Sequence, residues 1–236
     1  MATKRIFCLA SLYEPLEFLE NRIANFNQCD LSEAVVCFVD VSTPTTWAKV
    51  EKIIQGKAKF EYTLHHHAER KSLYWVWNWI IDKCMLECKP VYFCNTNVDD
   101  INHPEYFKKM STYLDENPKI KLVASPWGVT QIKGQRWPAQ MERGIVTPEP
   151  KKTCGHFPMW RASLHTSPVG KFHSDMVCVG DSFFWAKIRK EYGLNSLAVH
   201  PETLGCYLSH ENNLYHMSRG PKGQKGEAWD RSLMKK

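Results

Sequence analysis

The segment "PVYFCNTNVDD" (residues 90–100) joins an apolar run to a polar one that ends on two adjacent aspartates. Its first half is typical of a buried strand. Asp99 and Asp100 repel each other and lose solvation on burial, so a fold tolerates them best where solvent or a cation compensates. Oxygen ligands of this kind suit Mg²⁺ or Mn²⁺. The pair could equally cap the next helix, and the residues alone leave both interpretations open.

Apolar strand-like runs alternate with helical patterns around this segment. Strands are expected at residues 5–12, 34–40, 59–65, 90–94 and 119–125, and helices at 14–29, 43–56, 72–86 and 103–118. Such alternation predicts an α/β fold with a mostly parallel central sheet flanked by helices. Because ligands bind outside the carboxyl ends of parallel strands, Asp40 and residues 97–100 should face one crevice.

The second half of the chain is less regular. Turn-forming residues crowd the stretch 126–158, which predicts long connections with short strands. Helices are expected at 159–167 and 181–193, and short strands at 196–200 and 203–210. With no linker or repeat in sight, residues 1–216 are predicted to form one domain.

Charge is concentrated at the end of the sequence. The net charge is +6, and residues 217–236 carry six basic and two acidic side chains, which gives +4 in that stretch. This pattern predicts a flexible basic tail able to contact an anionic membrane surface. No basic patch interleaved with aromatics indicates nucleic-acid binding. Neither a membrane span nor a signal peptide is evident, so we expect a cytoplasmic, membrane-peripheral protein with reduced cysteines.

The longer segment "CNTNVDDINHPEYFKKMSTYLDENPKIKLV" (residues 94–123) resembles the metal-binding segment of the inverting family 2 glycosyltransferases, which have the nucleotide-sugar-binding GT-A fold. The resemblance extends over residues 4–216 in the family's order. It implies that Asp99 and Asp100 bind the metal and that Asn97 and Asp99 lie at the donor. Asn97 replaces the first aspartate of the family's D-x-D, so metal affinity is expected to be lower.

Three further segments carry the resemblance. "VVCFVDVST" (35–43) implies that Asp40 contacts the nucleotide base, and "RKSLYWVWNWII" (70–81) places Arg70 and Asn78 near the donor pyrophosphate. "LGCYLSHENNLYH" (204–216) implies that His210 completes the metal shell or touches the diphosphate. An ordinary loop histidine is the alternative. The opening "SLYE" (11–14) departs from the family's "SYNR" and leaves the first nucleotide contact open.

The acceptor side resembles the family through "CGHFPMWRASLHTSPVGKFHSDMVCVGDSFFWAKI" (154–188). The resemblance implies that Asp181 is the catalytic base, a role compatible with capping the helix that follows. Aromatic faces stack on sugar rings, so Phe157 or Trp160 could form an acceptor platform, with core packing as the alternative.

Together these features predict an inverting glycosyltransferase. It would move a hexosyl or deoxyhexosyl group from a nucleoside-diphosphate sugar to a hydroxyl of a glycan, lipid-linked or glycoprotein acceptor, with Mn²⁺ or Mg²⁺ and an aspartate base. Residues 1–125 would bind the donor and 126–216 the acceptor. A sugar nucleotidyltransferase is one alternative, although "SLYEPLEF" lacks the glycine-rich phosphate loop it needs. A non-catalytic nucleotide-sugar-binding module is the other, which Asn97 keeps open.

Overall fold

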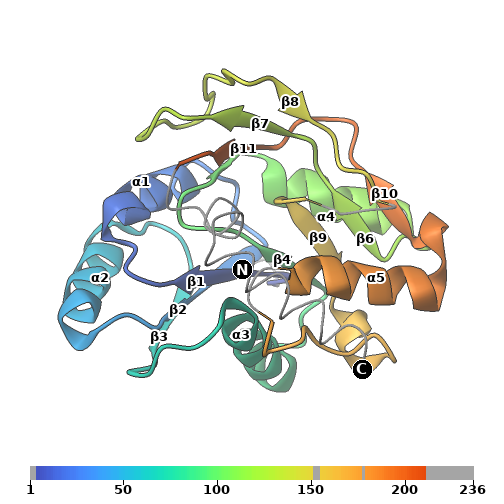
Figure 1. Cartoon of the computed structure of the whole chain (residues 1–236), viewed down its shortest axis with the longest axis horizontal. Helices are drawn as coiled ribbons and strands as arrows, with labels where there is room; N and C mark the ends of the chain where they lie inside the picture. Colours follow the sequence, from blue (N-terminus) through green and yellow to red (C-terminus); the bar gives the residue numbers. More distant parts are fainter. Residues whose placement is uncertain (1–3, 151–154, 177–178, 211–236) are drawn as a thin grey trace, which may run out of the picture.

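The computed structural model describes residues 4–150, 155–176 and 179–210. Within these residues the main sheet has seven strands in the order β10-β6-β9-β4-β1-β2-β3 (Figure 1). Their bounds are β1 Ile6–Leu12, β2 Ala34–Asp40, β3 Tyr62–His66, β4 Tyr92–Asn95, β6 Leu122–Ala124, β9 Pro158–Arg161 and β10 Leu197–Val199. All neighbouring pairs are parallel except the two that β9 makes. The predicted α/β fold with a mostly parallel sheet is confirmed.

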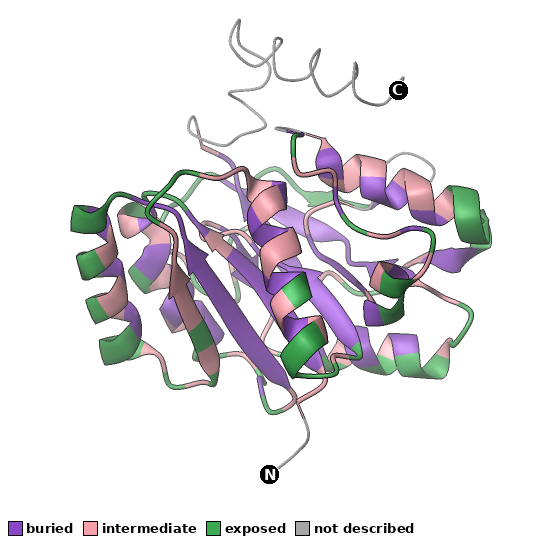
Figure 2. Ribbon diagram, turned by 90° about the horizontal axis from the view of Figure 1, so that it is seen from below, coloured by how far each residue is buried: buried purple, intermediate pink, exposed green. Residues whose placement is uncertain are grey.

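Helices cover both faces of this sheet (Figure 2). One core cluster lies against α3 (Leu73–Glu87) and α5 (Gly180–Tyr192), and the other against α1 (Leu16–Phe26), α2 (Pro44–Lys57) and α4 (Tyr106–Glu116). Strand residues alternate between the two clusters, as a strand buried on both sides requires. Both faces being apolar, these strands read as continuous hydrophobic runs in the sequence.

Strand β9 was not predicted. The sequence pattern favours a helix over 159–167, but residues Pro158–Arg161 form a strand and only the short 3₁₀ helix η1 (Ala162–Thr166) follows it. Met159 lies in one core cluster and Trp160 in the other, so this strand also buries both faces. Periodicity cannot separate such a run from a buried helix, which explains the error.

A second, smaller sheet lies beside the first, at the top of Figure 1. Its order among the described residues is β5-β11-β7-β8, with β5 Ile101–Asn102, β7 Trp127–Thr130, β8 Ile145–Val146 and β11 Gly205–Leu208. Strand β5 begins directly after Asp100 and pairs with β11, where Gly205 faces Asn102. This pairing places β11, near the end of the described residues, next to the turn that contains Asp99 and Asp100.

Helices begin at the carboxyl edge of the sheet with local capping. Thr43 accepts a hydrogen bond from the Thr46 amide (3.4 Å) at the start of α2, and Ser72 accepts one from the Trp75 amide (3.1 Å) at the start of α3. These hydrogen bonds fix the strand-to-helix connections at the edge where a ligand would bind. At the other end of α5, the 3₁₀ helix η2 (Leu194–Ser196) follows Gly193, whose φ of +79° favours glycine.

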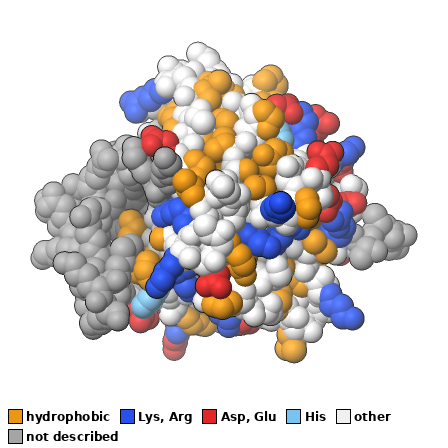
Figure 3. Space-filling view, turned by 90° about the vertical axis from the view of Figure 1, so that its right-hand side faces the viewer, with side chains coloured by type: hydrophobic (Ala, Val, Ile, Leu, Met, Phe, Trp, Pro, Cys, Tyr) orange, Lys and Arg blue, Asp and Glu red, His pale blue; other side chains and the backbone are white. Residues whose placement is uncertain are grey.

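Two surface features bear on partners. None of the helices in the described ranges combines the length and hydropathy that a bilayer-spanning segment needs. On the face shown in Figure 3, Lys and Arg side chains lie among acidic and apolar ones. The basic tail predicted at 217–236 lies outside the described residues.

Candidate active site at the carboxyl edge of the sheet

The aspartate turn, residues 96–100, connects β4 to β5. Asn97 Nδ2 donates to Asp100 Oδ2 (2.9 Å), so the amide that replaces the expected carboxylate holds its neighbour in place. Asp100 is 2% exposed, and its Oδ1 has no hydrogen-bond partner. Burial and the nearby Asp99 raise the pKa of Asp100 well above its usual range. The turn therefore holds a buried carboxyl group, that of Asp100, close to a second one, that of Asp99, as its sequence indicates.

A buried arginine supports this turn. Arg22, on α1, is 2% exposed, and its Nη1 donates to the carbonyl oxygen of Asp100 (2.8 Å). Its Nη2 donates to Asn102 Oδ1 (2.6 Å) and to the Thr96 hydroxyl. The guanidinium also packs 3.9 Å from the centre of the Phe26 ring. Burial lowers the pKa of Arg22, yet an arginine stays charged, so a fixed cation lies next to the carboxylates.

The role of Arg22 is absent from the sequence-based prediction. The sequence does carry a signal, because Arg22 falls among Leu19, Ile23 and Phe26 on the apolar face of its helix. A charged residue in that position must find partners inside the protein.

Asp99 contacts His210 beside the paired strands β5 and β11 of the second sheet. His210 Nε2 lies 2.8 Å from Asp99 Oδ2, and the two side chains are 8% and 14% exposed. The Phe18 ring packs against the imidazole with centroids 4.8 Å apart. Strand β11 pairs with β5 and ends at Leu208, and this pairing brings His210 to the turn although it lies 111 residues after Asp99 in the sequence. The structure therefore brings together two of the three predicted metal ligands.

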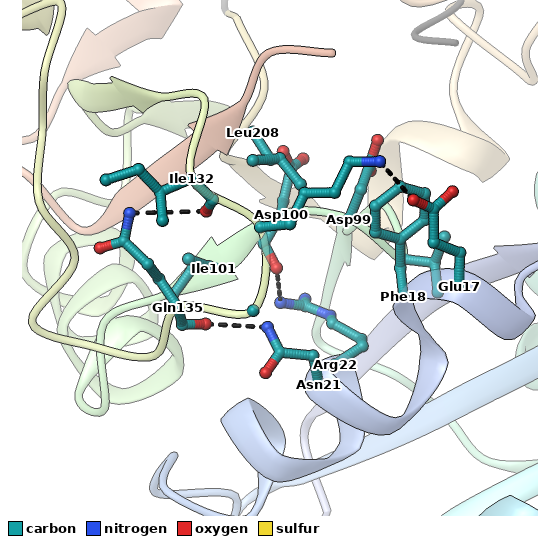
Figure 4. A pocket seen from close by; sticks show the side chains of 13 residues that line it. Glu17, Phe18, Asn21, Arg22, Asp99, Asp100, Ile101, Ile132, Gln135 and Leu208 are labelled. Atoms are coloured by element: carbon teal, nitrogen blue, oxygen red, sulfur yellow. Dashed lines mark hydrogen bonds and ion pairs between the residues drawn. The ribbon is translucent and has the colours of Figure 1, made fainter. Parts of the chain in front are cut away.

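A cavity opens between this turn and α1 (Figure 4). Phe18 and Arg22 line it from α1, Asp99 and Asp100 from the turn, and residues 132–135 from the β7–β8 connection. Asn21 Nδ2 donates to the carbonyl oxygen of Gln135 (2.8 Å), and Lys133 forms an ion pair with Glu17. These contacts attach the connection to α1 on the side of the turn where Arg22 lies.

The donor atoms in this region fit a metal ion that is shared with a ligand. Within the described part of the chain, no three His, Cys, Asp or Glu side chains are close enough to hold a metal unaided. Asp99 and His210 supply a carboxylate oxygen and an imidazole nitrogen, both suitable for Mn²⁺. Asp100 is less available, since it is buried and held by Asn97.

Asp40 lies at the predicted strand end, but its carboxylate is enclosed. It is 0% exposed, its Oδ1 accepts from the Ser42 amide (3.0 Å), and its Oδ2 accepts from the Ser42 hydroxyl (2.9 Å). His66 Nε2, on the neighbouring strand β3, lies 3.8 Å from Asp40 Oδ1. Burial raises the pKa of Asp40, against these hydrogen bonds. Asp40 braces the turn after β2, and a contact with a nucleotide base stays a prediction.

Arg70 lies over an aromatic ring at the same edge. Its guanidinium is 4.4 Å from the centre of the Tyr13 ring, and Tyr13 is 48% exposed. The next residue, Glu14, has a φ of +47°, which is unusual for a side-chain-bearing residue. The Ser42 hydroxyl accepts from the Glu14 amide (2.7 Å) and holds this backbone. The departure "SLYE" therefore forms a defined turn with an exposed aromatic ring.

Asn78 is held by the backbone of Phe172. Its Nδ2 donates to the Phe172 carbonyl (2.8 Å), and its Oδ1 accepts from the Phe172 amide (3.1 Å). Both ends of the side chain thus tie α3 to the segment after η1. The predicted contact of Asn78 with the donor pyrophosphate stays a prediction.

Asp181 lies in the first turn of α5. Its Oδ1 accepts from the Ser182 amide (2.6 Å) and from the Tyr74 hydroxyl (3.4 Å). Burial raises the pKa of Asp181 while these hydrogen bonds oppose the shift. The N-cap residue of α5 is Val179, so Asp181 lies inside the first turn, where its carboxylate accepts from the Ser182 amide, and its role as base stays a prediction.

The prediction of an aromatic acceptor platform is wrong. Phe157 is 1% exposed and Trp160 is 0% exposed, and each belongs to a core cluster. The Trp160 indole donates to His165 Nε2 (2.9 Å). Neither ring presents a face to a ligand, because both belong to the strand, or its approach, that the sequence pattern assigned to a helix. Core packing, the alternative, is correct.

A second histidine near the aspartate turn was also missed. His156 stacks on Tyr207, with ring centroids 4.2 Å apart, and meets Trp127 edge-on. Burial lowers the pKa of His156 to about 4, with only Asp99 opposing the shift. This side chain is therefore neutral at physiological pH.

Comparison with known proteins places this edge in context. No protein-family model matches the chain, and no curated protein matches it in sequence. Among solved structures, residues 1–349 of S. aureus TarS in complex with UDP-GlcNAc superpose with a TM-score of 0.67 at 16% identity, over 92% of this chain and 61% of that one. The mannosyltransferase PcManGT from Pyrobaculum calidifontis, in complex with GDP-Man and Mn²⁺, gives 0.66 at 14% identity, over 93% and 63%.

These similarities define the class of fold. The chain has the GT-A fold of nucleotide-sugar-dependent glycosyltransferases, which confirms the fold expected from the sequence resemblance. It spans a little over 60% of the length of these two structures, and 38% of a longer TarS structure. At this identity the similarity establishes the fold alone.

Proposed function

We propose that this protein is an inverting glycosyltransferase that uses a nucleoside-diphosphate sugar together with Mn²⁺ or Mg²⁺. The observation that carries the proposal is the meeting of Asp99 and His210 at the end of β4. Proteins of the same fold bind UDP-GlcNAc, in TarS, and GDP-Man with Mn²⁺, in the mannosyltransferase PcManGT. A carboxylate and an imidazole at a strand end suit a metal shared with a diphosphate.

Several residues at this edge would contribute to donor binding. Asp99 and His210 would hold the metal, which when bound neutralises charge that develops on the leaving diphosphate. Arg70, stacked on the exposed Tyr13, provides a cation near the donor. The turn that Asp40 braces would support the nucleotide base. Arg22 keeps the aspartate turn in place from the protein side.

Asp181 would act on the acceptor. It takes the proton of the acceptor hydroxyl, whose oxygen then attacks the anomeric carbon of the sugar. The bond from that carbon to the diphosphate oxygen breaks, and its electron pair leaves on the diphosphate. Attack opposite the leaving group inverts the anomeric configuration. Burial, which raises the pKa of Asp181, makes the carboxylate a stronger base than an exposed aspartate.

Substrates and location are part of the proposal at a coarser level. We expect a hexosyl or deoxyhexosyl donor and a hydroxyl on a glycan, lipid-linked or glycoprotein acceptor. A cytoplasmic site of action, with residues 217–236 against an anionic membrane surface, would fit the charge of that stretch.

One observation favours a second candidate, a non-catalytic nucleotide-sugar-binding module. Asn97 has an amide where a carboxylate is expected, and this amide donates its hydrogen bond to Asp100. Fewer ligands at the metal would weaken catalysis more than binding, because the metal acts mainly on the charge that develops during reaction.

A donor panel separates the two candidates. The protein is incubated with UDP-GlcNAc, other UDP-sugars and GDP-Man, with Mn²⁺ or with EDTA, and nucleotide release is measured. A transferase releases nucleotide from at least one donor in a metal-dependent manner, through transfer or slow hydrolysis. Metal-dependent binding of a donor without any release would identify the binding module instead.

A further inference from the structure

Tyr74 occupies a rigid position in the core beside α5. It lies on α3 and is 2% exposed. Its ring stacks on Phe172, with centroids 6.0 Å apart and planes at 19°, and meets Trp77 edge-on at 5.4 Å. A tyrosine ring buried in this way has little freedom to turn, so its hydroxyl is held at one point.

That point is the carboxylate of Asp181. The Tyr74 hydroxyl donates to Asp181 Oδ1 over 3.4 Å, and the Ser182 amide donates to the same oxygen over 2.6 Å. Both donors therefore act on one oxygen of the carboxylate.

The backbone before Asp181 is shaped to allow this approach. A Cβ atom at Gly180 would lie 2.7 Å from the Tyr74 ring, closer than any side chain can come. Glycine at this position lets the first turn of α5 rest directly on the ring. The contact between Tyr74 and Asp181 is thus supported by the packing of two helices, in addition to the hydrogen bond.

We propose that Tyr74 is the positioning residue of the catalytic base. By holding Oδ1 together with the Ser182 amide, it fixes the rotation of the carboxylate and makes Oδ2 the oxygen that receives the acceptor proton. This inference rests on the proposed function, because it takes Asp181 as the base.

The proposal has two consequences for the reaction. A carboxylate that loses one donor turns more freely and presents Oδ2 to the acceptor less often, which lowers the rate of the chemical step. The hydroxyl also stabilises the charged form of Asp181, so its removal raises the pKa of this carboxyl further. Donor binding depends on neither effect.

The test compares Tyr74→Phe with Tyr106→Phe. Tyr106 is a matched control, because it is 1% exposed and its hydroxyl donates to the Pro158 carbonyl (3.0 Å), outside the candidate site. We expect Tyr74→Phe to lower kcat by about tenfold with the KM for the donor unchanged, as for the loss of a hydrogen bond to a charged group. The acidic limb of the kcat/KM profile should move to higher pH, since the base then deprotonates at higher pH. Tyr106→Phe should leave both unchanged.

Asp181→Asn, assayed alongside, keeps the two levels of inference apart. If it is inactive while Tyr74→Phe matches Tyr106→Phe in kcat and in pH profile, the role of Tyr74 is refuted and the base assignment stands. If Asp181→Asn retains the activity of the unmodified protein, the base assignment itself fails, and the role of Tyr74 with it.

Discussion

Replacement of Arg22 by methionine tests how the aspartate turn is held. The side chain donates to four buried acceptors: the Asp100 carbonyl, Asn25 Oδ1, Asn102 Oδ1 and the Thr96 hydroxyl. Methionine fills much of the volume but removes this donor, and each acceptor left unsatisfied costs about 1–3 kcal/mol. Asn25 Oδ1 keeps its bond from the Asn102 amide (2.9 Å). Some can pair again, since the Thr96 hydroxyl already lies 3.3 Å from Asn102 Oδ1.

We therefore expect a loss of about 3–4 kcal/mol of unfolding free energy. The assay is urea unfolding followed by circular dichroism at pH 7 in EDTA. Arg5→Met is the matched control, because Arg5 pairs with Asp115 over 2.7 Å at a side-chain exposure of 30%. An ion pair of that kind contributes about 1 kcal/mol or less.

A double variant shows whether charge is part of the effect. Asp100→Asn removes the side-chain carboxyl that interacts electrostatically with Arg22 and keeps the backbone carbonyl that Arg22 donates to, so Arg22→Met should cost less in that background, by about 1 kcal/mol. A loss for Arg22→Met no larger than that for Arg5→Met would refute the role assigned to Arg22.

Three further predictions concern individual side chains. Asp181→Asn should abolish transfer while the affinity for the donor stays within about twofold, measured by calorimetry; equal loss of both would contradict its role as base. His210→Ala should weaken Mn²⁺ binding by at least about tenfold, whereas His103→Ala, which removes a ring packed on Trp137, should not; equal affinities would exclude His210 from the metal site. Burial lowers the pKa of His165 to about 4. The free energy of unfolding should therefore fall as the pH drops from about 6.5 to 4, because the imidazole of His165 is protonated at higher pH in the unfolded chain than in the folded one. The loss approaches about 3 kcal/mol at pH 4 and should diminish in His165→Gln; identical pH dependence would argue against it.

Most of the main sheet is predictable from the sequence, because strand and helix patterns alternate regularly up to residue 125. Strand β9 is not, because Met159 and Trp160 face opposite core clusters and the run lacks alternation. The second sheet is predicted only in part: β11 falls within the strand expected at 203–210, whereas β5 and β8 have two residues each and carry no periodic signal. Its pairing of β5 with β11 is what brings His210 to Asp99.

The site shows the same limit. Asp99, His210 and Asp181 were expected from the family resemblance, and the structure puts Asp99 in contact with His210. Arg22 and Tyr74 lie on apolar helix faces, and only their tertiary contacts reveal what they do. Conversely, Phe157 and Trp160 have the chemistry of a sugar platform, but burial removes them from any ligand.

We propose above that Asp99 and His210 hold a divalent metal against the diphosphate of a nucleotide sugar. The most direct test is a crystal structure of the protein with Mn²⁺ and whichever of UDP-GlcNAc or GDP-Man it binds, recorded with anomalous scattering at the manganese edge. We expect one manganese peak in contact with Asp99, His210 and the donor diphosphate, next to the end of β4. A donor bound at this edge without manganese, or a manganese peak remote from Asp99, would contradict it.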